Sequence, residues 1–257
     1  MTIYCLHEFH SLARLAKNRI IRTAAIMGYC TIALLCSSSV AQAQSQEFAT
    51  LQAWKASARN SAVGNQLLAV LNAQNAALAV NPKNKNALYM RGYLFGIIGC
   101  TSSAIGDLSK AIELDPNFAA AYTERGICYM DLKNYDRAKV DLERAMRLAP
   151  DSGDARFAHG KLMLEQEKPS IASADFRSCQ SGFCRFSPVL PGELPANYYN
   201  GPDYYLGVCD EMMGRQEEAL KHYKVASRQK AGTGYIKRYS DQPLDASYRV
   251  SKLETGI

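Results

Sequence analysis

The sequence predicts an all-α repeat array, and two observations lead to that prediction. Residues 85–118 and 119–152 are consecutive stretches of 34 residues that share nine identical positions, with glycine, alanine and proline among them. Within each stretch, apolar and small residues recur at the three- and four-residue spacing of amphipathic helices. A period of this length indicates a stack of equivalent helical units without one central core.

Each stretch is predicted to contain two antiparallel helices. In residues 85–118 the helical pattern breaks at Gly99 and the polar run 101–103, where one helix should end and the next be capped. Pro116 ends the second helix because proline cannot continue it. Gly92 and Ala104 are small enough to let the two helices approach closely, while larger side chains fill the space beside them.

This arrangement resembles the tetratricopeptide repeat, whose pattern alternates large, small and aromatic positions and closes on a proline. The resemblance implies a right-handed solenoid of antiparallel helix hairpins. It also implies a non-catalytic protein that needs no cofactor. The matching residues are Leu88, Gly92, Phe95, Ala104, Leu108, Ala111 and Pro116, and then Tyr122, Gly126, Tyr129, Ala138, Leu142, Ala145 and Pro150.

The same spacing weakens towards both ends of the chain. Terminal units of solenoids usually depart from the pattern because one of their faces meets water. The predicted organisation is a signal peptide at 1–43, a degenerate first repeat at 44–84, repeats at 85–118 and 119–152, degenerate repeats at 153–180 and 200–233, a proline-rich insertion at 181–199, and a C-terminal tail at 234–257.

The N-terminal segment has the three parts of a secretory signal. Basic residues from Arg14 to Arg22 precede an apolar run, residues 24–41, which ends at an Ala-x-Ala site. Cleavage after Ala43 would release a periplasmic or secreted chain. The alternative is an uncleaved anchor in the inner membrane that faces the periplasm, since 18 residues is near the lower limit for spanning a bilayer.

The cysteines suit an exported protein. Cys179 and Cys184 flank the proline-rich insertion and are predicted to form a disulfide. Thiol redox chemistry at this pair is the alternative, although such pairs usually have two intervening residues. Cys128 and Cys209 are expected to be buried thiols, and Cys100, in a helix–helix turn, an exposed one.

No catalytic or metal-binding motif is present in the sequence. Asp107, Asp141 and Asp175 recur at the repeat period and are predicted to be solvated, because carboxylates a full repeat apart cannot act on one substrate atom. His159 is predicted at a packing position and His222 on an exposed helix face. Without residues 1–43 the chain has 26 basic and 23 acidic residues, too small a surplus to indicate nucleic-acid binding.

The tetratricopeptide resemblance places a partner-binding groove along the first helices of successive units. Such a groove takes a peptide or a partner helix, and an apolar surface of this kind favours an interaction role. For some of these side chains, Tyr93 and Ile127 among them, packing between units is an open alternative. The predicted groove residues are Tyr89, Tyr93, Thr123, Ile127, Met130, Phe157, Lys161, Leu164 and Tyr204.

The sequence therefore predicts a protein-binding scaffold or adaptor in a bacterial cell envelope. A membrane-anchored accessory factor for envelope assembly or export is the alternative. The partner would be a protein or peptide, and membrane contact is expected only if residues 24–41 are retained. Neither the identity of the partner nor the oligomeric state follows from the sequence.

Overall fold

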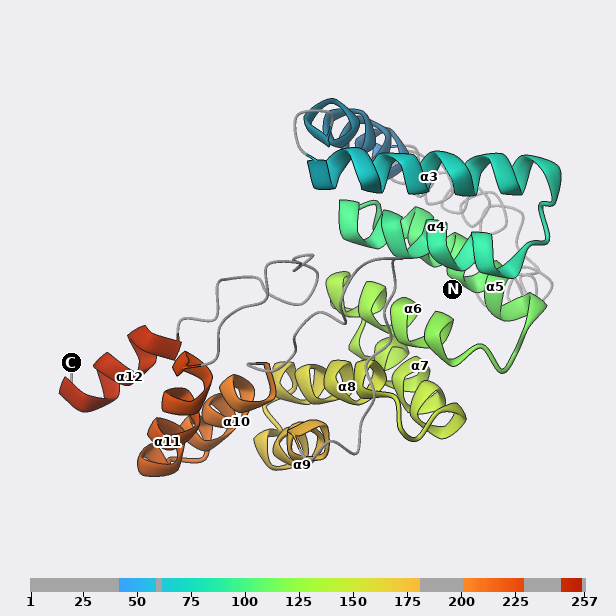
Figure 1. The fold of residues 1–257 in the computed structure, drawn as a ribbon. Coiled ribbons are helices and arrows are strands. Elements are labelled where there is room, and N and C mark those ends of the chain that lie inside the picture. The colour runs from blue at the N-terminus through green and yellow to red at the C-terminus, as the bar shows by residue number, and fades with distance from the viewer. Residues whose placement is uncertain (1–41, 59–61, 181–200, 229–245, 256–257) are drawn as a thin grey trace, which may run out of the picture. The chain divides into compact units, whose positions relative to one another are not determined.

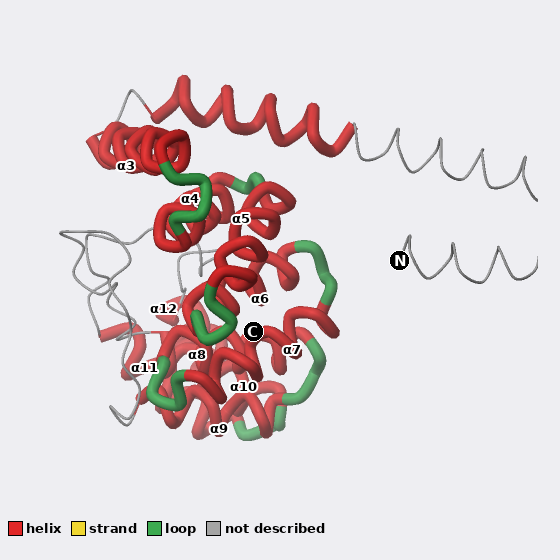
Figure 2. Tube along the Cα trace, turned by 90° about the vertical axis from the view of Figure 1, so that its right-hand side faces the viewer, coloured by secondary structure: helices red, strands yellow, loops and turns green. Residues whose placement is uncertain are grey.

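A computed structural model describes residues 42–58, 62–180, 201–228 and 246–255 of the chain (Figure 1). The chain divides at Gln52, and of the first part only residues 42–52 are described, which are helical. The described residues form helices and turns without strands (Figure 2), which confirms the all-α prediction. The helices are α3 (Ala62–Val80), α4 (Lys85–Ile98), α5 (Thr101–Leu114), α6 (Ala119–Asp131), α7 (Tyr135–Leu148), α8 (Gly153–Glu165), α9 (Pro169–Gln180), α10 (Gly201–Met212), α11 (Gln216–Arg228) and α12 (Ala246–Thr255).

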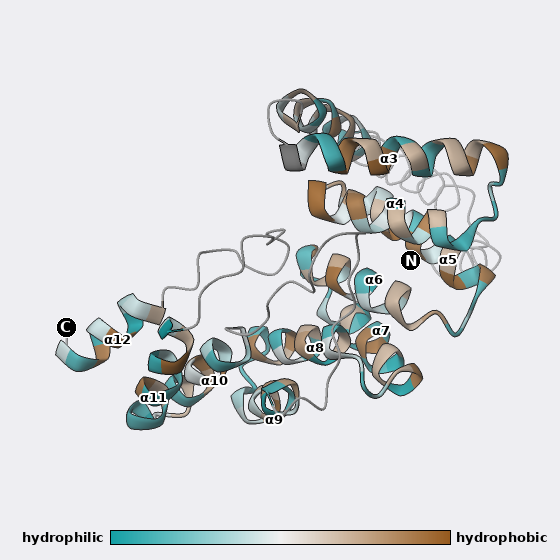
Figure 3. Ribbon diagram, viewed as in Figure 1, coloured by the Kyte–Doolittle hydropathy of each residue, from teal (hydrophilic) through white to brown (hydrophobic). Residues whose placement is uncertain are grey.

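Neighbouring helices pair along the chain. The most extensive contacts join α4 with α5, α6 with α7, α8 with α9, and α10 with α11. Each pair also contacts the next, and the first helices α4, α6 and α8 touch in sequence. Helices α3 and α4 are richer in apolar residues than α7 and α11 (Figure 3). The array is thus a chain of helix hairpins stacked on their neighbours.

One glycine in each pair allows the two helices to touch. A Cβ atom on Gly126 would lie 2.8 Å from Leu142 Cγ, and one on Gly92 would lie 2.9 Å from Leu108 Cγ. The same position faces larger partners in the later pairs, Phe176 opposite Gly160 and Tyr223 opposite Gly207. Any side chain there would push the helices apart, because protein interiors are close-packed. This confirms the close approach predicted at Gly92.

The turn between the two helices of each pair needs a left-handed residue at one fixed position. Gly99 and Gly214 occupy it with φ of 90° and 74°. Lys133 and Glu167 occupy it with φ of 55° and 56°, although residues with a Cβ atom disfavour this conformation. The backbone of the turn is therefore common to all four pairs, while its sequence is not.

The helix starts differ from the prediction at one place. Asn84, Asn134 and Ser152 each cap a helix by accepting a hydrogen bond from a backbone N–H three residues ahead. Cys100, however, is the N-cap of α5, and its side chain makes no capping bond. The polar run 101–103 lies inside the first turn of the helix rather than before it.

A helix also forms where the sequence showed no repeat. Helix α12 packs against α11, with Ala246 buried. Lys224 Nζ lies 2.6 Å from Glu254 Oε1 and ties α11 to α12. Within the described residues, α12 therefore covers the last hairpin of the array.

Candidate interaction surface

The predicted groove residues divide into two groups by burial. Tyr93, Thr123, Ile127 and Phe157 are buried, while Tyr89, Met130, Lys161, Leu164 and Tyr204 are half-buried. All nine lie on the first helices α4, α6, α8 and α10, and we call them the first-helix face. The second group is the part of this face that solvent reaches.

The buried members of the face join the hydrophobic core between pairs. Ile127 and Phe157 belong to one cluster with Leu206, so α6, α8 and α10 all contribute to it. Met130 and Leu164 pack against the edge of the same cluster and keep part of their surface accessible. The apolar residues of the face are therefore held in place by the core beneath them.

An aromatic group continues the face towards α10. Phe157 contacts Phe176 edge-on at 5.3 Å between ring centroids, and Tyr205 stacks on Phe176 at 5.2 Å. Lys161 Nζ lies 5.8 Å from the centroid of Tyr205, within range of a cation–π interaction. Tyr205 was not among the predicted groove residues, although its neighbour Tyr204 was, and the two rings meet edge-on at 5.4 Å.

The recurring aspartates are not solvated, so that prediction is wrong. Asp107, Asp141 and Asp175 are all buried. Asp141 accepts hydrogen bonds from Arg125 Nε at 2.7 Å and Nη2 at 2.8 Å, and Arg91 binds Asp107 with the same geometry. The nine identities included both arginines and both aspartates, so their 16-residue separation was the signal for a paired interaction.

The guanidinium groups also reach the preceding hairpin. Arg125 Nη1 donates to Ser109 Oγ at 3.0 Å, and Arg91 Nη1 donates to Asn75 Oδ1 at 3.1 Å. Burial acts to lower the pKa of Arg125, but the hydrogen bond and charge of Asp141 outweigh it and raise the pKa above its ordinary value. Arg125 thus stays charged, and each of the two arginines joins three helices.

In the third pair a histidine replaces the arginine. His159 lies at the position of Arg91 and Arg125, and its Nδ1 is 2.7 Å from Asp175 Oδ2. Arg156 supplies a longer contact to Asp175, at 3.8 Å, and its Nε is buried without a hydrogen-bond partner among the described residues. The predicted packing role of His159 is therefore correct, with a carboxylate as its neighbour.

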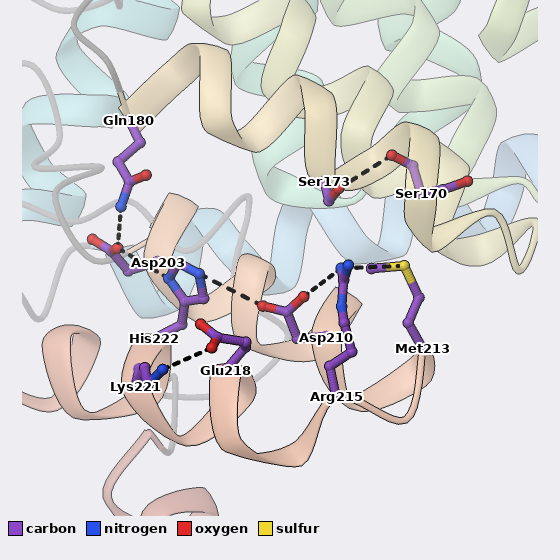
Figure 4. A network of polar contacts seen from close by, with 10 residues as sticks. All are labelled: Ser170, Ser173, Gln180, Asp203, Asp210, Met213, Arg215, Glu218, Lys221 and His222. Carbon is purple, nitrogen blue, oxygen red and sulfur yellow. Dashed lines mark hydrogen bonds and ion pairs between the residues drawn. The ribbon is translucent and has the colours of Figure 1, made fainter.

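The last pair reverses the arrangement. His222 occupies the aspartate position of α11 and lies between two buried carboxylates of α10, 3.7 Å from Asp203 and 3.6 Å from Asp210 (Figure 4). Gln180 of α9 donates to Asp203, and Arg215 lies 2.6 Å from Asp210. His222 is thus half-buried in a polar network, rather than exposed as predicted.

The four cysteines that the structure describes are all buried. This confirms the prediction for Cys128 and Cys209 and contradicts it for Cys100, which is 2% exposed because the N-cap of α5 turns inward. Burial, reinforced by the charge of Asp210, raises the pKa of Cys209 to about 12. Cys184 lies outside the described residues, so its disulfide with Cys179 and the thiol redox alternative stay predictions.

The described residues contain neither a membrane-spanning helix nor a cluster of metal ligands. None of their helices is long and apolar enough to cross a membrane. Their histidine, cysteine, aspartate and glutamate side chains form no group of three or more that could hold a metal ion. The predicted signal segment and proline-rich insertion lie almost wholly outside this part of the chain.

Comparison with known proteins agrees with this architecture. The family model of the tetratricopeptide repeat matches residues 119–152, the pair α6 and α7. A tetratricopeptide-repeat protein of Thermus thermophilus, TTC0263, superposes with a TM-score of 0.55 at 17% identity, over 79% of this chain and 98% of that one. The fold is therefore that of a tetratricopeptide solenoid.

Two curated relatives share parts of this sequence. Human DnaJ homolog subfamily C member 3 is 28% identical over 117 residues, which are 46% of this chain and 23% of that protein. The type IV pilus assembly protein PilF of Pseudomonas aeruginosa is 26% identical over 153 residues, which are 59% of this chain and 58% of that protein. The chain thus spans about a quarter of the length of the first relative and just over half of the second.

Proposed function

We propose that this chain is a non-catalytic scaffold that binds a peptide or a partner helix on its first-helix face. The observation that carries the proposal is the recurrence of large, half-exposed apolar side chains on consecutive first helices. Tyr89, Met130, Leu164 and Tyr204 lie on α4, α6, α8 and α10, respectively. Half-exposed anchors supported by a packed core are typical of the energetic centres of interfaces.

The packing below the face favours a preformed site. Met130 and Leu164 rest on the cluster that contains Ile127 and Phe157, so their side chains are already restricted before a partner arrives. When a partner covers them, these side chains therefore lose less conformational freedom than mobile side chains would. The face needs no chemistry of its own to perform this role.

A crosslinking pull-down from cell extract tests the proposal. The bait would be the wild-type chain, and the test variant Met130→Gln/Leu164→Gln, which changes two half-buried residues of the face. The matched control is Val140→Gln/Ile171→Gln, which alters exposed apolar residues on the second helices of the same pairs. A partner that is lost with the test variant alone, at unchanged helix content, would support the face; equal recovery by both variants would contradict it.

The proposed location is the bacterial cell envelope, after cleavage at Ala43. The basic stretch, the apolar run and the Ala-x-Ala site support export. Intact-mass measurement on envelope fractions would distinguish the possibilities. A chain that begins at Gln44 supports a released protein, a chain that retains residues 24–41 in the membrane fraction supports the anchored alternative, and recovery in the cytosol contradicts both.

An accessory role in envelope assembly or export is the second candidate. The similarity to a pilus assembly protein over 59% of this chain favours it. Mass spectrometry of the crosslinked partner tests this role. A component of an envelope assembly or export system, captured in intact cells, supports it, and a partner from the cytosol contradicts it.

A further inference from the structure

The C-terminal ends of two first helices, α6 and α8, carry acidic residues at one repeat position. Asp131 is the last residue of α6 and Glu165 is the last residue of α8, 34 residues later, and both are exposed. Helices α6 and α8 touch, and Tyr135 Oη, at the start of α7 just after Asp131, donates to Glu165 Oε2 at 3.3 Å, so the two ends lie at the same side of the array. We call Asp131 and Glu165 the acidic edge.

Helix stability does not account for the acidic edge. The C-terminal end of a helix carries partial negative charge, so acidic residues there are unfavourable and basic ones are favourable. Three of the four second helices follow this rule, with Arg147, Arg177 and Arg228 in the last turns of α7, α9 and α11, and α5 is the exception. In contrast, the last turns of α6 and α8 contain no basic residue. The partial negative charge of each helix end therefore adds to the charge of its own carboxylate.

Each acidic residue directly follows an apolar residue of the first-helix face. Met130 precedes Asp131, and Leu164 precedes Glu165. Both apolar side chains are half-buried at the margin of the core cluster. A partner on this face would therefore meet an apolar anchor and a carboxylate together at each of two neighbouring helix ends.

At helix α10, an acidic residue near the C-terminal end is contacted by a basic residue of another helix in the same chain. Glu211 lies one residue before the end of α10 and accepts hydrogen bonds from Arg249 of α12 and from the Tyr223 hydroxyl, the latter at 2.8 Å. The Arg249 guanidinium also lies over the Tyr223 ring, 5.8 Å from its centroid. At α10 the acidic end of a first helix is thus covered by an arginine from a docked helix.

We propose that the first-helix face takes a basic amphipathic helix of a partner protein. Its lysine or arginine side chains contact Asp131 and Glu165, and its apolar side chains cover Met130 and Leu164. Packed helices lie about 8–10 Å apart, and a helix rises about 10 Å over seven residues. Basic residues seven positions apart on the partner therefore match the two acidic helix ends. This inference rests on the proposed function and specifies its partner.

A binding titration with the purified full-length chain tests the charge requirement. The probe is a fluorescein-labelled amphipathic helical peptide with two lysines seven residues apart, and its twin carries glutamates in their place. Fluorescence anisotropy should show binding of the lysine peptide and binding of the glutamate twin weaker by about tenfold or more. Equal binding of the two peptides would overturn the inference.

Charge-reversal variants test the position of the contact. Asp131→Lys/Glu165→Lys should weaken binding of the lysine peptide by about tenfold. The control Glu113→Lys/Asp151→Lys makes the same change in net charge at exposed positions near the opposite ends of the helices, and should change binding by less than about twofold. Equal losses in both variants would mean that net charge alone drives binding, and would overturn the inference.

The outcomes separate this inference from the proposed function. If the Met130→Gln/Leu164→Gln chain loses its cellular partner while the acidic-edge variant retains it, the face binds a partner but not through Asp131 and Glu165. If the face variant also retains the partner, the proposed function itself fails. Helix content measured by circular dichroism must match wild type in every variant.

Discussion

Arg125 and Asp141 join the two helices of the repeat that the family model matches, through two parallel hydrogen bonds at 2.7 and 2.8 Å. Two-point contacts between a guanidinium and a carboxylate fix direction as well as distance. Asp141 is 4% exposed, so its charge depends on this arginine for compensation. The pair therefore sets how α6 and α7 face each other.

Removing one member of this pair should be costly. We expect Arg125→Met to lower the free energy of unfolding by about 3 kcal/mol, because it leaves a buried carboxylate without its countercharge. The double variant Arg125→Met/Asp141→Leu should lose less than the single one. Urea unfolding followed by circular dichroism measures both, and a larger loss in the double variant would contradict the assignment.

The inter-helix glycine gives a second prediction. Gly126→Ala should destabilise the chain by about 1–3 kcal/mol, since its Cβ atom would lie 2.8 Å from Leu142 Cγ. Gly106 of α5 is the control, because a Cβ atom added there would meet no atom within 4 Å. Gly106→Ala should instead stabilise by about 0.5–1 kcal/mol. Thermal unfolding should shift in opposite directions for the two variants.

The third prediction concerns Lys133, the left-handed residue in the turn between α6 and α7. Lys133 adopts a φ of 55°, which glycine tolerates better than lysine. Lys133→Gly should therefore raise the free energy of unfolding by roughly 1 kcal/mol. Lys139→Gly, at an exposed position inside α7, should lower it by about the same amount. Destabilisation by Lys133→Gly in urea titrations would show that the side chain contributes more than the backbone strain it imposes.

The fourth prediction concerns the buried thiol of Cys209. Its pKa of about 12 means that the folded chain keeps a proton that an unfolded thiol, with a pKa near 8.5, releases. Stability should therefore fall as pH rises from about 8.5 towards 12. In the folded chain at pH 8.5, we expect iodoacetamide to modify Cys209 at least about 100-fold more slowly than in urea.

Peptide mapping by mass spectrometry reports the modification at Cys209 separately from the other cysteines. Cys209→Ala should also flatten the decline in the urea midpoint between pH 8 and 10. Equal alkylation rates in the folded and unfolded chain would show that solvent reaches the thiol.

The sequence predicted those parts of the fold that a repeat displays directly. Gly92, Gly126 and Gly160 recur at a fixed period, and their small size leads to the close approach of two helices. The turn at Gly99 could be placed because the helical pattern breaks at this glycine. A period also aligns residues of unlike chemistry, which is how His159 could be recognised at the position of the two arginines.

Other features depend on partners that one position does not reveal. An aspartate on an isolated helix is usually solvated, and only the arginine 16 residues earlier makes burial of Asp141 favourable. Helix α12 has no repeat pattern, and its place is set by contacts such as that of Arg249 with Glu211. Burial of Cys100 follows from the direction of a helix start, which local sequence does not specify.

The first-helix face was predicted only in part from the sequence. The repeat register placed all nine residues on first helices, but it could not separate side chains that fill the core from those that solvent reaches. Ile127 and Phe157 fall in the first group because the helices of the next hairpin cover them. Met130 and Leu164, nearer the helix ends, extend to its margin.

Arg91 and Arg125 have a consequence for folding cooperativity. Each links its own hairpin to the one before, through Asn75 or Ser109, so a hairpin that opens there breaks contacts in its neighbour as well. His159 has fewer donors than arginine, and Leu206 at the next equivalent position has none. Coupling of this kind is therefore built into α3–α7 and is weaker from α8 onward. Under mild denaturant, amide hydrogens of α8–α11 should exchange as a separate and less protected group than those of α4–α7.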